Sequence, residues 1–455
     1  FFRGAQVELD APVLAFSLLA TAVAMLAFGL VPALLAGRRR LGVSLQGASA
    51  RATAGRGSRR LLAASVVAQV ALALVLTFGA GLLVRSFVQL TAVDTGFSRQ
   101  GVLTQAVPLL SDEYADPIKA RQAYDRMVER VTALPAVEAA AGVLLRPLSG
   151  PNGFDAPFTI EGRPAEEQAA YPLLNLEAVT PDYFRAIGIP IHEGRHFARS
   201  DDADAPGVVV VSRALAEAHW PGESPVGKRL KWGGPESQSP WLEIVGVAGD
   251  ARYRRMEEVS LDVYVPHTQT TWSLNHLVVR TAGDPLAVAP SVREAIREVD
   301  PNLQPMDVAT TAQMVSRAVA RPRFNAVLLG VFAGLALVLG AVGLYGVLSY
   351  IVALRRKEIG IRMALGARPE QAARLALGQA LRLTLVGVAL GVAASLWLSR
   401  ALTGLLSDVL FEVAATDVAT LVTVPWLLVA VALLAAAAPA LRASRVDPGV
   451  VLRAE

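Results

Sequence analysis

Long apolar stretches alternate with charged stretches along the chain. Five of them approach or exceed the roughly 20 residues that a helix needs to cross a bilayer. They are approximately Pro12–Ala36, Leu61–Val84, Phe324–Val352, Leu377–Leu402 and Val418–Leu441. Arg382 lies near the start of the fourth stretch, where its long side chain can reach the membrane interface. The pattern predicts an α-helical integral membrane protein with five transmembrane helices.

Residues 87–323 have the mixed pattern of a folded domain outside the bilayer. Strands are expected at Gly101–Pro108, Val137–Leu144, Phe158–Glu161, Leu173–Val179, Val208–Val211, Leu242–Ala248, Asp262–Val265 and Leu274–Arg280. Helices are expected at Pro117–Leu134, Pro181–Ile187, Ser212–Ala218, Leu286–Val299 and Val308–Ala320. Asp116 before Pro117, and Ser212, are suited to cap two of these helices. Alternating strands and helices around a sheet predict a large α+β domain with ferredoxin-like halves.

Basic residues are concentrated on alternate sides of the apolar stretches. Gly37–Arg60 contains seven arginines and no acid, and Ala353–Arg374 contains six basic residues and two acids. Gly404–Asp417 contains three acids and no base. Because basic loops stay in the cytoplasm, the first two segments are predicted to be cytoplasmic. The N-terminus of this chain and residues 87–323 are then outside, and the C-terminus is inside.

The first and last apolar stretches share a pattern. Asp10 precedes Pro32 by 22 residues, and Asp417 precedes Pro439 by the same 22. Pro32-Ala33-Leu34 matches Pro439-Ala440-Leu441, and four further residues match at the same offset. We infer that residues 1–36 are the last helix of an upstream repeat and that residues 37–60 form a flexible cytoplasmic linker. The chain begins with Phe1, and we expect it to be part of a longer product.

Composition narrows the possible functions. Hydrophobic residues make up 53% of the 455 residues and charged residues 18%, against about 25% charged in soluble domains. The absence of cysteine excludes disulfides and thiolate metal sites. The spans contain almost no buried charge of the kind that marks an ion pathway. Spans on both sides of the arginine-rich linker argue against a nucleic-acid partner.

Glycines recur at helical spacing within the spans, for example Gly330 with Gly334 and Gly387 with Gly391. Small residues at this spacing let helix backbones approach closely in lipid. We expect this pattern to serve packing within one subunit, and a dedicated dimer face is the alternative.

His192-Glu193-Gly194-Arg195-His196 matches the zinc-protease pattern His-Glu-x-x-His. That chemistry needs both histidines on one face of a helix, with the glutamate polarising a metal-bound water. The preceding Ile189-Pro190-Ile191 is typical of extended chain, and Arg195 would place a cation beside the metal. A surface strand or turn without metal is therefore predicted, with a membrane metalloprotease as a remote alternative.

Residues 222–228 match the first seven positions of a phosphate-binding loop. Arg229 follows where Ser or Thr would hold magnesium, and Pro225 removes a backbone donor from a loop that works through backbone donors. We predict a turn here, no cofactor, and no ATP hydrolysis by this chain.

Residues Leu354 to Gly366 read LRRKEIGIRMALG and separate two apolar spans. So charged a run must lie on one face of the membrane. The apolar residues threaded among the charges favour a short helix that docks on another protein, and an ordinary basic loop is the alternative. Glu358 and Arg362 are spaced to pair along a helix. Gly360 and Gly366 could allow close approach or end the helix.

The string Arg356-Lys357-Glu358-Ile359-Gly360-Ile361-Arg362-Met363-Ala364-Leu365-Gly366-Ala367 resembles the coupling segment of MacB/FtsX-type ABC transporter permeases. Thr180–Phe184, Gly194–Phe197 and Pro225–Lys228 are similar to strings of the same family's outer domain. The order of spans resembles the C-terminal part of duplicated, acidobacterial-type orphan permeases. The resemblance implies a span at 61–86 and a MacB-like periplasmic core at 87–323. It also implies an FtsX-like three-helix domain at 324–441, with coupling segment 354–374, and a cytoplasmic tail at 442–455.

The same resemblance implies a non-catalytic permease subunit of an ABC-type export or mechanotransmission complex in the bacterial inner membrane. A separate cytoplasmic ATPase would bind the coupling segment through Arg356, Glu358, Ile359, Gly360, Arg362 and Gly366. Other expected partners are membrane lipid, a periplasmic adaptor or cargo, and the upstream repeat in a dimer or pseudo-dimer. An FtsX-like membrane scaffold that regulates a cell-wall hydrolase is the alternative.

Overall fold

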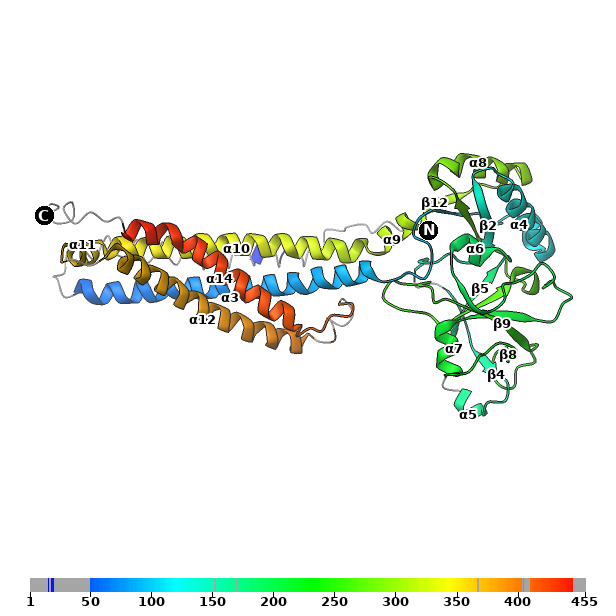
Figure 1. Cartoon of the computed structure of the whole chain (residues 1–455), viewed down its shortest axis with the longest axis horizontal. Coiled ribbons are helices and arrows are strands. Elements are labelled where there is room, and N and C mark those ends of the chain that lie inside the picture. The colour runs from blue at the N-terminus through cyan, green and yellow to red at the C-terminus, as the bar shows by residue number, and fades with distance from the viewer. Residues whose placement is uncertain are drawn as a thin grey trace. The chain divides into compact units, whose positions relative to one another are not determined.

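The structure is a computed structural model and describes residues 15, 18–19, 50–150, 153–168, 171–365, 368–402, 404 and 410–444. The chain divides into two compact units (Figure 1). The helical unit comprises Phe1–Gly81, Leu329–Leu402 and Thr416–Glu455. The globular unit comprises Leu82–Leu328 and Thr403–Ala415.

Four helices in the described part of the chain are long and apolar enough to cross a membrane. They are α3 (Ala50–Ala92, with the candidate span Arg60–Ala92), α10 (Ala320–Leu354), α12 (Pro369–Ala401) and α14 (Val418–Ser444). Four of the five predicted spans are thereby found. The predicted span Pro12–Ala36 lies outside the described residues, apart from Ala15, Leu18 and Leu19.

The predicted linker and α3 overlap. Gly37–Ser49 lies outside the described residues, but Ala50–Arg60 belongs to α3. The expectation of a flexible linker as far as residue 60 is therefore wrong for this last part. Its alanines and arginines have high helix propensity, and the adjoining apolar helix already supplies the costly first turn.

Glycines place α12 directly against α3. A Cβ atom added to Gly387 would lie 2.7 Å from Val70 Cβ, and one added to Gly391 would lie 2.8 Å from Leu74 Cβ. The expected packing within one subunit is confirmed at this crossing. In α10, by contrast, a Cβ at Gly330 or Gly334 would meet no atom within 4 Å in the described part of the chain.

The globular unit is built on a 12-stranded sheet. Its strands are β1 (Val102–Ala106), β2 (Val137–Val143), β3 (Phe154–Ala156), β4 (Phe158–Ile160), β5 (Leu174–Val179), β6 (Ile191–Gly194), β7 (Val208–Ser212), β8 (Arg229–Trp232), β9 (Leu242–Ala248), β10 (Asp262–Pro266), β11 (His276–Thr281) and β12 (Met306–Thr310). All eight of these predicted strands are present, β6 lies in the segment predicted as a surface strand or turn, and β3, β8 and β12 were not predicted.

The helices of this unit are η2 (Asp112–Ala115), α4 (Pro117–Thr132), α5 (Ala165–Gln168), α6 (Tyr183–Ile187), α7 (Arg213–His219), η3 (His267–Gln269), α8 (Pro285–Val299) and α9 (Thr311–Ala318). The predicted caps are confirmed. The Asp116 side chain accepts a hydrogen bond from Ile118 N at 2.8 Å, and Ser212 Oγ accepts one from Leu215 N at 3.3 Å. The helix predicted at Val308–Ala320 starts only at Thr311, because the residues before it pair with β1.

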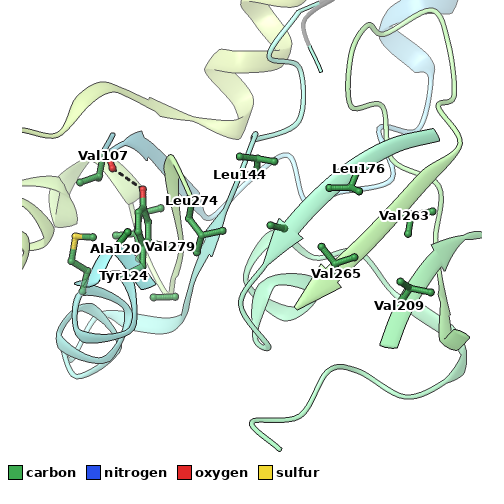
Figure 2. Packing of buried hydrophobic residues seen from close by; sticks show 14 of the residues in the cluster. Val107, Ala120, Tyr124, Leu144, Leu176, Val209, Val263, Val265, Leu274 and Val279 are labelled. Atoms are coloured by element: carbon green, nitrogen blue, oxygen red, sulfur yellow. Dashed lines mark hydrogen bonds between the residues drawn. The ribbon is translucent and has the colours of Figure 1, made fainter. Parts of the chain in front are cut away.

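Four strands form a ferredoxin-like part of the globular unit. They lie in the order β12-β1-β11-β2, and every neighbouring pair is antiparallel. With α4 between β1 and β2, and α8 between β11 and β12, this is a split β-α-β arrangement. Both helices contribute to the core, where the Tyr124 hydroxyl donates to the Val107 carbonyl at 2.7 Å (Figure 2).

The remaining strands are inserted between β2 and β11 and are arranged differently. Six of them continue the sheet in the order β5-β10-β7-β9-β8-β4, with β5 parallel to β10 and β7 parallel to β9. The other two lie off this path, where β3 pairs with β5 and β6 pairs with β9. The prediction of two ferredoxin-like halves therefore holds for one part only. Parallel neighbours need crossover connections, which a short periodic pattern does not reveal.

Substitution of Thr310 tests whether α9 begins at Thr311. Gln313 N donates to Thr310 Oγ1 and Thr310 N donates to Gln313 Oε1, both at 3.1 Å, so a capping box starts α9. Thr310→Ala should lower the free energy of unfolding by about 1 kcal/mol, because the amide of Gln313 loses its acceptor, Thr310 Oγ1. Denaturant unfolding in detergent measures this. Thr132→Ala, at the exposed end of α4, is the control, and equal losses in both variants would contradict the capping role.

Candidate functional site: the short helix between two spans

A short helix separates two of the membrane-crossing helices. After α10 ends at Leu354, Arg355 adopts a turn conformation (φ −95°, ψ 6°), and α11 spans Arg356–Ala364 (Figure 1). Ile359 N donates to the Arg355 carbonyl at 2.8 Å, which ties the new helix to the turn. Pro369 occupies the first position of α12, where its missing N–H costs nothing. The predicted short helix is confirmed.

One face of α11 carries exposed charged and aliphatic side chains. Glu358, Ile361, Arg362 and Leu365 follow i, i+3, i+4, i+7 spacing and therefore lie along one stripe, which we name the exposed stripe. Ile361 is 42% exposed and Leu365 84% exposed. Arg362 Nη2 lies 2.6 Å from Glu358 Oε1, with both side chains more than half exposed. Such a pair contributes only about 0.3–0.5 kcal/mol, so the stripe is not explained by stability.

The opposite face of α11 packs inward. Gly360 is buried, and Ile359 and Met363 are half-buried. Ile359 and Met363 line a pocket of about 80 Å³ together with Ile351 from the end of α10 and Ala372 and Leu375 from the start of α12. The same pocket is also lined by Glu358 and Arg362, so these two side chains border it while remaining exposed to solvent.

The six residues predicted to contact an ATPase do not all lie on the same face of α11. Glu358 and Arg362 come together on the exposed stripe, whereas Ile359 and Gly360 belong to the inward face. The side chain of Arg356 and all of Gly366 lie outside what the structure describes. Ile361 and Leu365 complete the exposed stripe but were not among the six predicted residues. Their spacing from Glu358 is the signal that could have identified them.

The histidine pair does not have zinc-site geometry. His192 lies in β6, and His196 follows the strand, so the two are not on one helical face. Arg195 pairs with both carboxylate oxygens of Asp201 at 2.7 and 2.9 Å. No group of three His, Cys, Asp or Glu side chains that could hold a metal ion occurs within the described ranges. A surface strand or turn was predicted here, and the structure has the strand β6 over Ile191–Gly194.

Residues 222–228 form a turn, as predicted. A phosphate-binding loop connects a strand to a helix, whereas this segment leads from α7 into strand β8. Lys228 Nζ lies 2.5 Å from Glu223 Oε2, and Gly227 N donates to the Ile244 carbonyl at 2.8 Å. The lysine and this glycine amide are thus already engaged within the domain.

Two protein-family models match this chain. The family model of the FtsX-like permease C-terminal region matches residues 330–448, and that of the MacB-like periplasmic core domain matches residues 62–299. The chain belongs to the MacB/FtsX-type ABC transporter permeases. This membership and the four membrane-crossing helices indicate an integral protein of the bacterial inner membrane. The kinship to duplicated orphan permeases stays a prediction.

Individual MacB/FtsX-type relatives are longer than this chain. The macrolide export ATP-binding/permease protein MacB of Hahella chejuensis is 28% identical over 284 residues, covering 60% of this chain and 42% of the relative. The pyoverdine export ATP-binding/permease protein PvdT of Pseudomonas putida is 25% identical over 224 residues, covering 47% and 34%. The chain thus spans less than half the length of these two relatives.

Among solved structures, the periplasmic region of MacB from Actinobacillus actinomycetemcomitans is similar to the MacB-like part of this permease. It shares 12% identity with a TM-score of 0.34, covering 50% of this chain and 95% of that one.

Proposed function

We propose that this permease is one subunit of an ABC-type export or mechanotransmission complex. A separate cytoplasmic ATPase binds the exposed stripe of α11 and drives movement of the globular unit. The observation that carries this proposal is a short helix between two membrane-crossing helices that buries Gly360 and exposes Glu358, Ile361, Arg362 and Leu365. A stripe of this mixed composition suits a protein partner, because aliphatic contacts supply buried area and charges supply specificity.

ATP hydrolysis is assigned to the partner and not to this chain. Both relatives named above are ATP-binding/permease proteins, and the matched regions of this chain are permease regions. Residues 222–228, which resemble a phosphate-binding loop in sequence, form a turn between α7 and β8. This chain is thus a non-catalytic subunit that receives mechanical work.

The direction of coupling follows from charge. Six basic residues lie in Ala353–Arg374, which includes α11, and the positive-inside rule puts this segment in the cytoplasm. The globular unit is then extracytoplasmic. Nucleotide-driven closure of the ATPase acts on α11 and shifts the equilibrium between two arrangements of the spans, provided that it contacts the two arrangements differently. Since the spans carry few charges, movement of the outer domain is favoured over ion conduction.

The natural absence of cysteine makes this orientation directly testable. Leu365→Cys and Glu236→Cys each introduce one thiol at an exposed position, the first on the exposed stripe and the second in the loop before β9. In intact spheroplasts, a membrane-impermeant maleimide should label Glu236→Cys fully and Leu365→Cys only after permeabilisation. The reverse labelling would place the exposed stripe outside and remove the basis for an ATPase partner.

A further inference from the structure

Two carboxylic acids are buried on neighbouring strands of the globular unit. Glu177 in β5 is 1% exposed and Asp262 in β10 is 0% exposed. Glu177 Oε2 accepts a hydrogen bond from Leu145 N at 2.9 Å, and Asp262 Oδ1 accepts from Asn175 Nδ2 at 2.8 Å and Ser260 Oγ at 2.5 Å. The second oxygens, Glu177 Oε1 and Asp262 Oδ2, have no hydrogen-bond partner among the described residues.

The surroundings do not neutralise two negative charges. The charged and titratable groups that act on the pair are Arg254, Asp155, Asp250, Tyr183, Tyr253 and Tyr264. Arg254 is the basic member of this set, and its guanidinium already pairs with the Asp155 carboxylate. A buried carboxylate without its own counter-charge takes up a proton instead of staying ionised.

The pKa values of Glu177 and Asp262 are both raised, as expected for buried acids without a counter-charge. Burial raises the pKa of Asp262 to about 7. Burial also raises the pKa of Glu177 well above its usual range, and repulsion from Asp262 adds to that increase. The hydrogen bonds from Leu145 N, Ser260 and Asn175 act in the opposite direction without cancelling the effect. The pair therefore retains at least one proton under conditions in which exposed acids are ionised.

The pair lies where the two parts of the sheet meet. β2 of the ferredoxin-like part and β5 of the inserted part share a single Cα pair, Val143 with Val179. Beside it, Leu144 N donates to the Ala178 carbonyl at 2.9 Å. The next amide along the chain, Leu145 N, is bound by the Glu177 carboxylate instead of by a backbone carbonyl. A buried acid side chain thus completes the junction between β2 and β5.

We propose that Glu177 and Asp262 form a proton-binding site and that the bound proton holds the junction between β2 and β5 closed. When the proton leaves, Glu177 and Asp262 carry two buried negative charges that repel each other. Opening of the junction then lets water solvate the two carboxylates, which lowers both their repulsion and the desolvation cost of their charges. The ligand is the proton itself, and external pH sets how firmly the inserted part is attached.

The direction of the pH effect follows from linkage. The unfolded or opened state has acids of ordinary acidity, which lose their protons near pH 4. The closed state keeps its proton up to about pH 7 at Asp262. Closure is therefore most favourable below about pH 4 and weakens as pH rises towards about 7, with the opening equilibrium changing roughly tenfold per pH unit for each proton involved.

Hydrogen exchange of the full chain in detergent, read by mass spectrometry, tests the proposal. After correction for the intrinsic base-catalysed rate, protection of the peptide that contains Val143 and Leu145 should fall roughly tenfold per pH unit between about pH 5 and 7. Glu177→Gln and Asp262→Asn, which keep shape but cannot ionise, should flatten that profile. Glu236→Gln and Asp182→Asn change exposed acids of the same unit and should leave it as it is in the unsubstituted chain.

Four results would overturn the proposal. A flat profile in the unsubstituted chain would show that no proton is linked to the junction. An unchanged slope in both substituted chains would assign the proton to other groups. Recovery of protection at about pH 8 on adding Mg²⁺ or Ca²⁺, reversed by chelator, would make the pair a cation site. If the variants do not fold, infrared spectra of the unsubstituted chain decide. A protonated-carboxyl band must persist at about pH 6, where exposed acids are ionised, and its absence overturns the proposal.

Discussion

Glu358→Lys should abolish recruitment of the ATPase while leaving the permease inserted and folded. The substitution reverses a charge on the exposed stripe and places a lysine one turn from Arg362. On the helix itself, the like-charge pair costs only a few tenths of a kcal/mol, so α11 should survive. At an interface, a mispaired charge costs about 2–5 kcal/mol, which lowers binding by roughly thirtyfold or more. Co-purification with the ATPase, and its stimulation in proteoliposomes, measure the loss.

Two controls separate a contact role from a general charge effect. Glu370→Lys makes the same change at an exposed position in the first turn of α12, off the exposed stripe, and should retain recruitment. The double swap of Glu358→Lys with Arg362→Glu restores an ion pair on α11 but exchanges its polarity, and should not restore binding. Undiminished co-purification of the Glu358→Lys chain would remove α11 as the docking element.

Gly387→Leu should strongly destabilise the helical unit. A Cβ at Gly387 would lie 2.7 Å from Val70 Cβ and 3.0 Å from the Val67 carbonyl oxygen, so a larger side chain meets backbone that cannot rotate away. α12 and α3 would have to separate along the crossing that Gly387 and Gly391 create. Overpacking of this kind typically costs about 1–3 kcal/mol, and the backbone contact argues for the upper end. Thermal unfolding of the purified chain in detergent should show a clearly lowered midpoint.

Gly378→Leu is the matched control, because it makes the same change on the same helix. A Cβ at Gly378 would meet no atom within 4 Å in the described residues. Leucine also has higher helix propensity than glycine, by somewhat under 1 kcal/mol. Gly378→Leu should thus be neutral or slightly stabilising. Equal destabilisation by both substitutions would show that the close approach at Gly387 is not what holds α12 and α3 together.

Several parts of this fold were predictable because their causes are local. The four described spans follow from long runs of apolar residues, because a chain segment in the hydrocarbon core must form a helix to satisfy its backbone hydrogen bonds. α4 and α7 begin where Asp116 and Ser212 can cap them, and the capping bonds join residues two or three positions apart. The short helix α11 between two spans was likewise predictable from alternating charge and apolar residues.

Other elements could not be read from the chain because a distant strand creates them. β12 was predicted as the start of a helix, and only pairing with β1, some two hundred residues earlier, makes Met306–Thr310 extended. For β6, local residues left a strand or a turn open, and pairing with β9 makes this mainly exposed segment a strand. The ferredoxin-like order of four strands likewise becomes visible only when the insertion between β2 and β11 is folded.

The sequence by itself determined the membrane class, the position of α11 and the sign of its charge, because hydrophobicity and capping act over a few residues. The tertiary structure alone decided which residues of α11 are exposed, since Ile359 is half-buried beside α10 and α12 whereas Leu365 is 84% exposed. It also decided that Asn175 and Glu177, which alternate with leucines like solvent-facing residues, are buried. Both faces of β5 are covered by apolar side chains from elements distant in the chain, and no local pattern records that second layer.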